Sequence, residues 1–298
     1  MLRIRQYGLG TFVGIGILFV MAISPVYADA EIPASIAVRC GNLLVRFDGA
    51  KFWTLNRIEY KGTLLGLDYP GSHYGSVVNF PGVGFIGSGH RENEDEKVIA
   101  LRCFVDGRPA APEAVPGNDP VKTFRMGRET AIRDLSFVNT VELRDDRIYE
   151  TVELKSEKEQ PVSFIYNFMH PWTLSATSFL AGTDEGKELK GAFTGSEKFV
   201  VEEPMDWIAV YDPSSGKGVV SRLLAKPQVG GAEMLLWDVG RLYRKFYLRS
   251  FSTEGQPIPA GFRGEYKLVT GFFEAGEEGW EQSARKLADD LREEKKAE

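Results

Sequence analysis

The sequence has few of the residues that common catalytic and metal-binding motifs require. Its 298 residues include three histidines and two cysteines. The cysteines do not have the spacing of a zinc site, and the chain has no HExxH helix, EF-hand loop, P-loop, GxSxG turn or dinucleotide-binding fingerprint. We therefore expect no cofactor and no metal, and the three histidines become the first candidates for function.

Positive charge and long apolar runs are also scarce. The chain has 36 basic and 42 acidic residues, which gives a formal net charge of −6 at pH 7. Nucleic acids select basic surfaces, so a nucleic-acid partner is not expected. After residue 30 no apolar run approaches the roughly twenty residues of a spanning helix, so we expect no membrane span in the mature chain.

The first thirty residues have the pattern of a secretory signal peptide. Arg3 and Arg5 precede an apolar run at 12–23, and small residues follow at cleavage spacing near Ala30. This run is shorter than a membrane-spanning helix requires. We predict a signal peptide over residues 1–30 and a periplasmic or secreted mature protein. An uncleaved membrane anchor is the alternative.

Short runs rich in β-branched and aromatic residues, separated by turn residues, predict an all-β fold. Residues 42–47 and 53–60 flank the turn DGAKF, and residues 135–143 and 147–154 flank the turn RDD. Many strands without intervening helical periodicity indicate a large antiparallel β-sandwich or barrel. We expect residues 31–298 to form a single domain of this kind.

One helix is indicated, at the end of the chain. Trp280, Ala284, Leu287 and Leu291 recur at helical spacing with charged residues between them. The pattern predicts a helix over about residues 278–294 that packs on the β-structure.

The two cysteines allow alternative states. Cys40 and Cys103 fall in separate predicted strands. An oxidising compartment permits a disulfide between them if these strands adjoin. Two buried thiols that behave as small apolar side chains are the equally weighted alternative.

A glycine-rich loop supplies the first candidate site. The sequence FIGSGHRENED, residues 85–95, places His90 and Glu92 two residues apart after two glycines. Glycines let backbone approach a ligand closely, and loops of this composition commonly carry binding residues. We select His90 and Glu92 as catalytic candidates; further binding candidates nearby are His73, Asn79 and Arg91. A solvated surface loop is the alternative.

A second candidate site follows an apolar strand. In YNFMHPWTL, Asn167, His170 and Trp172 lie around Pro171. Because proline favours an extended conformation in the residue before it, we expect the strand to end here with His170 at the sheet rim. An aromatic surface beside polar groups suits a sugar, so His170 is a catalytic candidate and Asn167 and Trp172 are binding candidates. A core tryptophan beside a hydrogen-bonded histidine is the alternative.

Three more residues complete the set of binding candidates. Asp206 stands beside Trp207, and Trp237 and Arg244 belong to a mixed polar and aromatic segment. If His170 met His90 and Glu92, the three would form a two-histidine, one-carboxylate metal set. Nothing in the sequence brings these residues together, and a metal is not predicted.

The β-rich body, the segment NFMHPW and the export pattern together resemble the galactose mutarotase-like supersandwich superfamily, which includes aldose epimerases and polysaccharide lyases. The resemblance implies a β-supersandwich that binds sugar, with His170 as a general acid. It also implies a late carboxylate base, for which Glu233, Glu265 and Glu274 are the candidates; none stands in a recognisable motif.

We therefore predict a secreted protein that binds or acts on carbohydrate, with epimerase-like or lyase-like acid–base chemistry. The loops carrying His90 and His170 are expected to form two walls of one cleft. A non-catalytic glycan-binding or structural protein of the cell envelope is the alternative.

Overall fold

The computed structural model describes residues 33–69, 71–253 and 255–294, so the predicted signal peptide lies outside the described residues. These described residues form one compact unit. Within the part of the chain that is described, no helix is long and apolar enough to cross a membrane.

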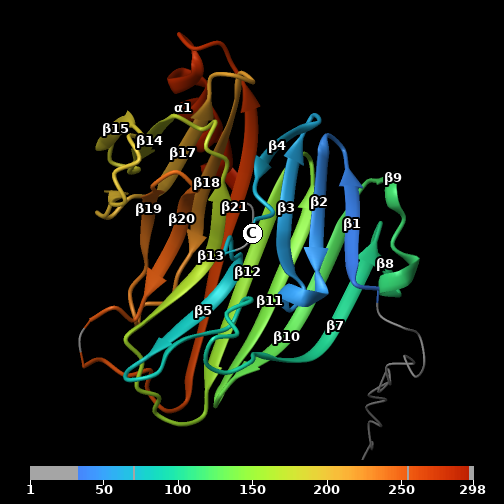
Figure 1. The fold of residues 1–298 in the computed structure, drawn as a ribbon, viewed down its shortest axis with the longest axis vertical. Coiled ribbons are helices and arrows are strands. Elements are labelled where there is room, and N and C mark those ends of the chain that lie inside the picture. Colours follow the sequence, from blue (N-terminus) through green and yellow to red (C-terminus); the bar gives the residue numbers. More distant parts are fainter. Residues whose placement is uncertain (1–32, 70, 254, 295–298) are drawn as a thin grey trace, which may run out of the picture. The chain divides into compact units, whose positions relative to one another are not determined.

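Two large β-sheets pack face to face (Figure 1). The eleven-stranded sheet contains β1 (Ser35–Cys40), β2 (Leu43–Asp48), β3 (Thr54–Tyr60), β4 (Thr63–Gly66), β5 (Gly75–Phe80), β6 (Gly84–Ile86), β9 (Gly117–Val121), β13 (Phe164–Trp172), β16 (Phe199–Val201), β19 (Glu233–Val239) and β20 (Tyr243–Ser250). Its order is β16-β19-β20-β13-β4-β3-β2-β1-β9, with β5 paired to β13 and β6 paired to β5. Its pairs are antiparallel except for β1 and β9.

The second sheet has ten strands and is antiparallel throughout. It contains β7 (Lys97–Val105), β8 (Arg108–Ala110), β10 (Phe124–Ile132), β11 (Leu135–Arg144), β12 (Arg147–Ser156), β14 (Ser178–Gly182), β15 (Glu188–Ala192), β17 (Trp207–Asp212), β18 (Lys217–Ala225) and β21 (Phe262–Glu274). Its order is β15-β14-β17-β18-β21-β12-β11-β10-β7-β8. Short 3-10 helices, η1 (Gly49–Lys51) and η2 (Pro112–Ala114), stand in two of the connections.

The main core lies between the sheets and follows from alternation along the strands. In β10, every second residue from Phe124 to Ile132 is buried, while the residues between these are more exposed. Successive side chains of a strand point to opposite faces, so each strand gives alternate residues to this core. The predicted all-β sandwich is confirmed.

Helix α1 (Trp280–Glu294) covers part of the other face of the ten-stranded sheet, against β17, β18 and β21. Its buried side chains are Trp280, Ala284, Ala288 and Leu291. The Trp280 ring stacks on Tyr211 with ring centroids 5.1 Å apart. The predicted helix is thus confirmed, and its apolar stripe packs on the sheet.

The two cysteines are separate buried thiols. Cys40 lies in β1 and Cys103 in β7, so they belong to different sheets, and both are free. Burial raises the pKa of each thiol to about 11. The structure therefore agrees with the predicted alternative of two buried thiols and not with a disulfide.

The packing of α1 gives a stability prediction. Leu291 is fully buried, and its replacement by alanine leaves a cavity that lowers the free energy of unfolding by about 2–5 kcal/mol. Leu242→Ala is the control, because Leu242 is 47% exposed. Urea unfolding of both variants measures the difference. Equal stabilities would show that the helix does not contribute to the cooperative unit.

Candidate functional site

A β-bulge in β13 determines which side chains face the core. Asn167 is paired with Leu248 of β20 and His170 with Phe246, so three steps along β13 match two along β20. Phe168 occupies the bulge with a φ of 51°. As a result Tyr166 packs on the outer face of the eleven-stranded sheet, whereas His170 faces the opposing sheet.

His170 is enclosed between the sheets. Its imidazole is fully buried, and its Nε2 lies 2.7 Å from Oε2 of Glu150 in β12 of the other sheet. Its ring neighbours are Tyr74, Trp172 and Phe246. Substrate has no access to this imidazole in the structure, which matches the alternative of a core histidine.

The expected strand end at His170 is wrong, because β13 continues to Trp172. Pro171 is tolerated in this strand because β5 pairs with β13 only as far as Met169, and β4 pairs with it only at Trp172. The Pro171 carbonyl accepts a hydrogen bond from the backbone N–H of Leu67. Asn167 is fully buried as well, and neither atom of its amide has a partner.

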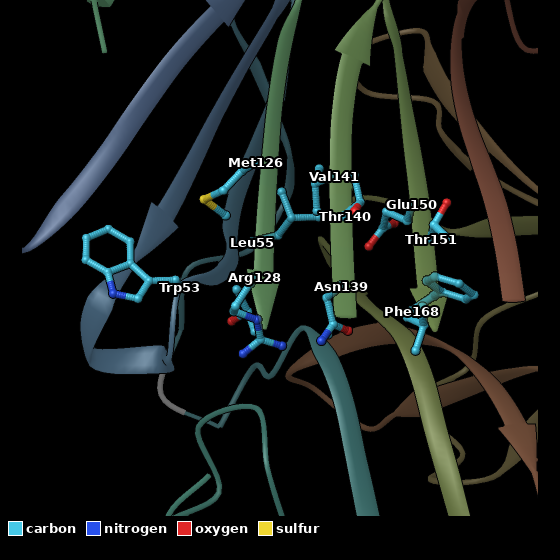
Figure 2. A pocket seen from close by; sticks show the side chains of 13 residues that line it. Trp53, Leu55, Met126, Arg128, Asn139, Thr140, Val141, Glu150, Thr151 and Phe168 are labelled. Atoms are coloured by element: carbon cyan, nitrogen blue, oxygen red, sulfur yellow. The ribbon is translucent and has the colours of Figure 1, made fainter. Parts of the chain in front are cut away.

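A small cavity lies beside the Glu150 carboxylate (Figure 2). Arg128, Asn139 and Phe168 are among its lining residues. Its volume of about 20 Å³ corresponds to about one water molecule. The Nδ2 atom of Asn139 is buried without a partner and suits a bound water. The cavity is too small for a sugar, so the interior is not the candidate binding site.

A buried ion pair fastens the glycine-rich loop to the ten-stranded sheet. Oε1 of Glu96 lies 3.1 Å from Arg128 of β10, and Oε2 accepts a hydrogen bond of 2.8 Å from the Ser88 backbone N–H. Arg128 also donates to the Phe52 carbonyl at 2.7 Å. Both charged side chains are almost fully buried. Ser88 lies two residues before His90, so this pair positions the histidine.

The outer face of the eleven-stranded sheet carries a continuous row of aromatic rings. We call the surface formed by Phe85, Tyr166, Tyr247, Trp237 and Phe199 the aromatic face. The ring centroids of Phe85 and Tyr166 are 6.4 Å apart, and those of Tyr166 and Tyr247 are 4.5 Å apart. The centroids of Tyr247 and Trp237 are 6.4 Å apart, and those of Trp237 and Phe199 are 5.3 Å apart. Most of these rings are only partly buried, so they can contact a ligand.

Two histidines and a glutamate lie at one end of the aromatic face. The His90 ring is 5.1 Å from Phe85 and 4.0 Å from His73. The Nδ1 atom of His90 lies 2.7 Å from Oε1 of Glu92. Burial alone would raise the pKa of Glu92, but the hydrogen bond from His90, a backbone hydrogen bond and the electrostatic effects of His90 and His73 together lower that pKa. Glu92 is therefore a carboxylate at neutral pH.

His73 is held in the neutral form. Burial, followed by the electrostatic effects of His90, Lys245 and Lys51, lowers its pKa to about 3. Its Nδ1 atom is buried without a hydrogen-bond partner. Gly89 lies against this ring with a φ of +84°, and a Cβ there would stand 3.1 Å from Nδ1, so close packing requires glycine.

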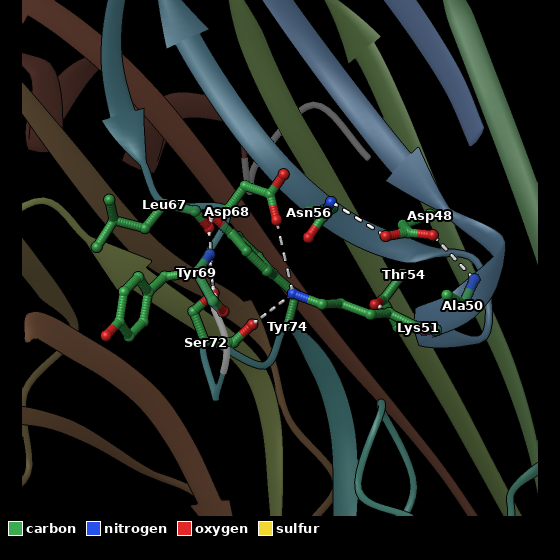
Figure 3. A network of polar contacts seen from close by, with 10 residues as sticks. All are labelled: Asp48, Ala50, Lys51, Thr54, Asn56, Leu67, Asp68, Tyr69, Ser72 and Tyr74. Atoms are coloured by element: carbon green, nitrogen blue, oxygen red, sulfur yellow. Dashed lines mark hydrogen bonds and ion pairs between the residues drawn. The ribbon is translucent and has the colours of Figure 1, made fainter. Parts of the chain in front are cut away.

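Lys51 fixes the segment that precedes His73 (Figure 3). Its Nζ donates to the Ser72 carbonyl at 3.4 Å and lies 3.8 Å from the Asp68 carboxylate. The Tyr74 hydroxyl donates to the Leu67 carbonyl at 3.0 Å. These bonds connect η1 with the strand that follows the segment and hold His73 beside His90.

The other predicted residues divide between this site and the rest of the molecule. Asn79 pairs with Phe85 and Phe164 and shares the outer face with them. Trp237 belongs to the aromatic face itself. Arg91 lies over the Phe52 ring, 4.5 Å from its centroid, and donates to the Ala50 carbonyl.

Arg244 and Asp206 have structural partners elsewhere. Arg244 lies on the inner side of β20, where it is paired with the buried Asp238 and stacks over Phe193. Asp206 accepts a hydrogen bond of 2.7 Å from the Asp184 backbone N–H. Neither residue contacts the aromatic face.

His90 and His170 lie on opposite faces of the eleven-stranded sheet, so the single cleft expected between their loops does not form. The metal set of these two histidines with Glu92 does not form either. In residues 33–69, 71–253 and 255–294 there is no cluster of three side chains that could hold a metal.

The three late glutamates that were candidates for the base do not lie together either. Glu233 lies on the outer side of β19, 2.8 Å from Arg249, on the same side as Trp237. Glu265 and Glu274 lie in β21 of the other sheet. The sequence analysis did not select Glu96, Arg128, Tyr166, Tyr247 or Lys245 as site residues, because a single sequence does not show which strands adjoin.

Solved structures share this architecture at very low identity. The Slr1438 protein from Synechocystis sp. PCC 6803 is 10% identical with a TM-score of 0.50, over 83% of this chain and 99% of that one. The α-N-acetylgalactosaminidase NagBb from Bifidobacterium bifidum is 10% identical with a TM-score of 0.52, over 86% of this chain and 39% of that one. A galactose mutarotase-like protein from Lactobacillus casei is 8% identical with a TM-score of 0.49, over 80% of this chain and all of that one.

The chain has the galactose mutarotase-like fold. The sequence resemblance predicted this supersandwich, and the comparison confirms the fold alone. No protein-family model matches the sequence, and no curated protein matches it.

The depressed pKa of His73 predicts a pH effect on stability. Unfolded histidine has a pKa near 6.5, so between that pH and about 3 the unfolded state binds more protons, and His73 lowers stability as the pH falls. His73→Asn should lose less stability than wild type from about pH 7 to about pH 4. Urea unfolding at both pH values measures this; parallel losses in the two proteins would contradict the effect of burial on His73.

Proposed function

We propose that this protein binds carbohydrate on the aromatic face and that His90, paired with Glu92, carries out acid–base chemistry on the bound sugar. The observation that supports the proposal most is the continuous row of five rings, four of them partly exposed, that ends at a histidine–carboxylate pair. The solvent-facing side of an ordinary antiparallel sheet carries mostly polar side chains, so it does not need a row of aromatic rings.

Sugar rings have apolar C–H faces that stack on aromatic rings and hydroxyl groups that need hydrogen bonds. Tyr166 and Trp237 provide flat surfaces on adjoining parts of the sheet. Asn79, on the same face, has an amide that donates and accepts, which suits a pair of hydroxyl groups. This combination favours sugar over a purely apolar ligand.

The His90–Glu92 pair is arranged for proton transfer. Because Glu92 is a carboxylate, it accepts a hydrogen bond from Nδ1–H of His90, and the lone pair of the neutral imidazole is then on Nε2. Such an imidazole can remove a proton from a sugar hydroxyl and return it. Opening of the sugar ring at C1, the epimerase-like reaction implied by the sequence resemblance, requires this kind of group.

We also propose that the mature protein acts outside the cytoplasm. The support is the signal-peptide pattern of residues 1–30. The periplasm or the exterior would also give access to envelope glycans.

The aromatic face can be tested by truncation of its rings. Tyr166→Ala and Trp237→Ala should each weaken sugar binding about 10-fold, because each removes a stacking surface. Phe104→Ala is a matched control, since Phe104 lies in β7 of the other sheet beneath Arg125. Isothermal calorimetry of the mature protein with neutral and acidic oligosaccharides measures the affinities. Equal affinities in all three variants would exclude this face.

Polarimetry separates an enzyme from a binding module. The wild type should speed the interconversion of sugar anomers, and His90→Asn should reduce the rate about 100-fold or more while sugar affinity changes little. Binding without turnover in the wild type would instead support the non-catalytic glycan-binding alternative. Absence of both would favour a structural role in the cell envelope.

A further inference from the structure

A buried lysine lies beneath the aromatic face. Lys245 is 2% exposed and stands in β20 on the same side as Tyr243 and Tyr247. Its Nζ lies 5.5 Å from the centroid of the Tyr243 ring and 5.7 Å from the centroid of the Tyr247 ring. It donates a hydrogen bond to the carbonyl of His73, whose ring contacts His90.

Lys245 has no carboxylate partner within the described residues. The neighbouring cations of β20 each have a carboxylate partner: Arg244 is paired with Asp238, and Arg249 is paired with Glu233. The buried Lys217 of the other sheet donates to Thr63 and to a backbone carbonyl. Lys245 instead has one carbonyl acceptor and two ring faces for three ammonium hydrogens.

A charged ammonium is energetically unfavourable in these surroundings unless a further group binds it. An uncompensated buried charge is strongly unfavourable, and the usual response of a buried lysine is loss of the proton. Burial, and then the nearby charge of Lys51, lowers the pKa of Lys245 well below its usual range. A bound anion would restore the charged form. The other groups around this ammonium are His73, Tyr243 and Tyr247, none of them an anion at neutral pH.

We propose that the sugar bound on the aromatic face carries an anionic oxygen group, which Lys245 recognises with Lys51 at the same end of the face. A uronate carboxylate and a phosphate ester share the required chemistry. The inference rests on the proposed sugar-binding function and adds the substrate class. Charged hydrogen bonds contribute about twice as much as neutral ones, so the anion would decide which sugars bind.

The experiment compares matched sugars on three proteins. Glucose, glucuronate and glucose 6-phosphate, with neutral and uronate oligosaccharides of equal length, are titrated by calorimetry into wild type, Lys245→Met and Lys217→Met. An anionic sugar should bind wild type and Lys217→Met at least about 10-fold tighter than its neutral counterpart. Lys245→Met should lose this preference and keep its affinity for the neutral sugar, which also shows that it is folded.

A second readout concerns protons. At mildly alkaline pH, calorimetry in two buffers of different ionisation enthalpy should show proton uptake when the anionic sugar binds wild type, because the anion raises the depressed pKa of Lys245. Lys245→Met should show none. A preference for uronate or for phosphate identifies which anion is recognised, and either result supports the inference.

Two outcomes would overturn the inference and are distinguishable from each other. Equal binding of neutral and anionic sugars, with sensitivity to Tyr166→Ala, would reject the anionic substrate and leave the proposed function intact. Binding of no sugar at all would reject both. An anionic preference that persists in Lys245→Met would assign recognition to other residues and reject the role of Lys245.

Discussion

One extra residue in β13 determines the character of both faces of the eleven-stranded sheet. The bulge at Phe168 shifts the alternation, so that Tyr166 and Met169 pack outward while Asn167 and His170 point inward. Without it, strict alternation from Tyr166 would place His170 on the outer face. Gly75 of β5 lies opposite the bulge, paired with Met169, and a Cβ there would stand 2.8 Å from Thr54 and from Ser88. The bulge, the glycine and the loop carrying His90 are therefore parts of one packing arrangement.

The two sheets contribute differently to the candidate site. The eleven-stranded sheet supplies the rings, and the ten-stranded sheet anchors the loop that brings His90 to them. That anchor is the Glu96–Arg128 pair, which is buried and also bonded to backbone groups of Ser88 and Phe52. Breaking such a pair leaves a lone buried charge, which is costlier than the pair itself is favourable. The loop is glycine-rich, yet its position is determined by charges of the sheet below it.

Local sequence patterns predicted the features that depend on local structure. Strand runs, turn residues and the period of the last helix gave the sandwich and α1, and the pattern GSGHRE led to His90 and Glu92. The failures have one cause, which is that pairing between distant strands is not visible in one sequence. His170 attracted attention as a histidine before a proline, but the bulge that buries it depends on register against both β20 and β5. Tyr166, Tyr247 and Lys245 lie in the two segments that supplied the other candidates, but their place on one face depends on the pairing of β13 with β20.

The chain contains two histidine–glutamate pairs with the same separation, and their surroundings assign them different roles. His170 and Glu150 are 2.7 Å apart with side chains 0% and 6% exposed; His90 and Glu92 are 2.7 Å apart with side chains 17% and 55% exposed. The first pair joins the two sheets across the core, where a sugar cannot enter. The second stands at the end of the aromatic face, where a substrate hydroxyl can reach the imidazole. The two distances are equal, so access, which follows from the register of β13, distinguishes the structural pair from the pair proposed to act on substrate.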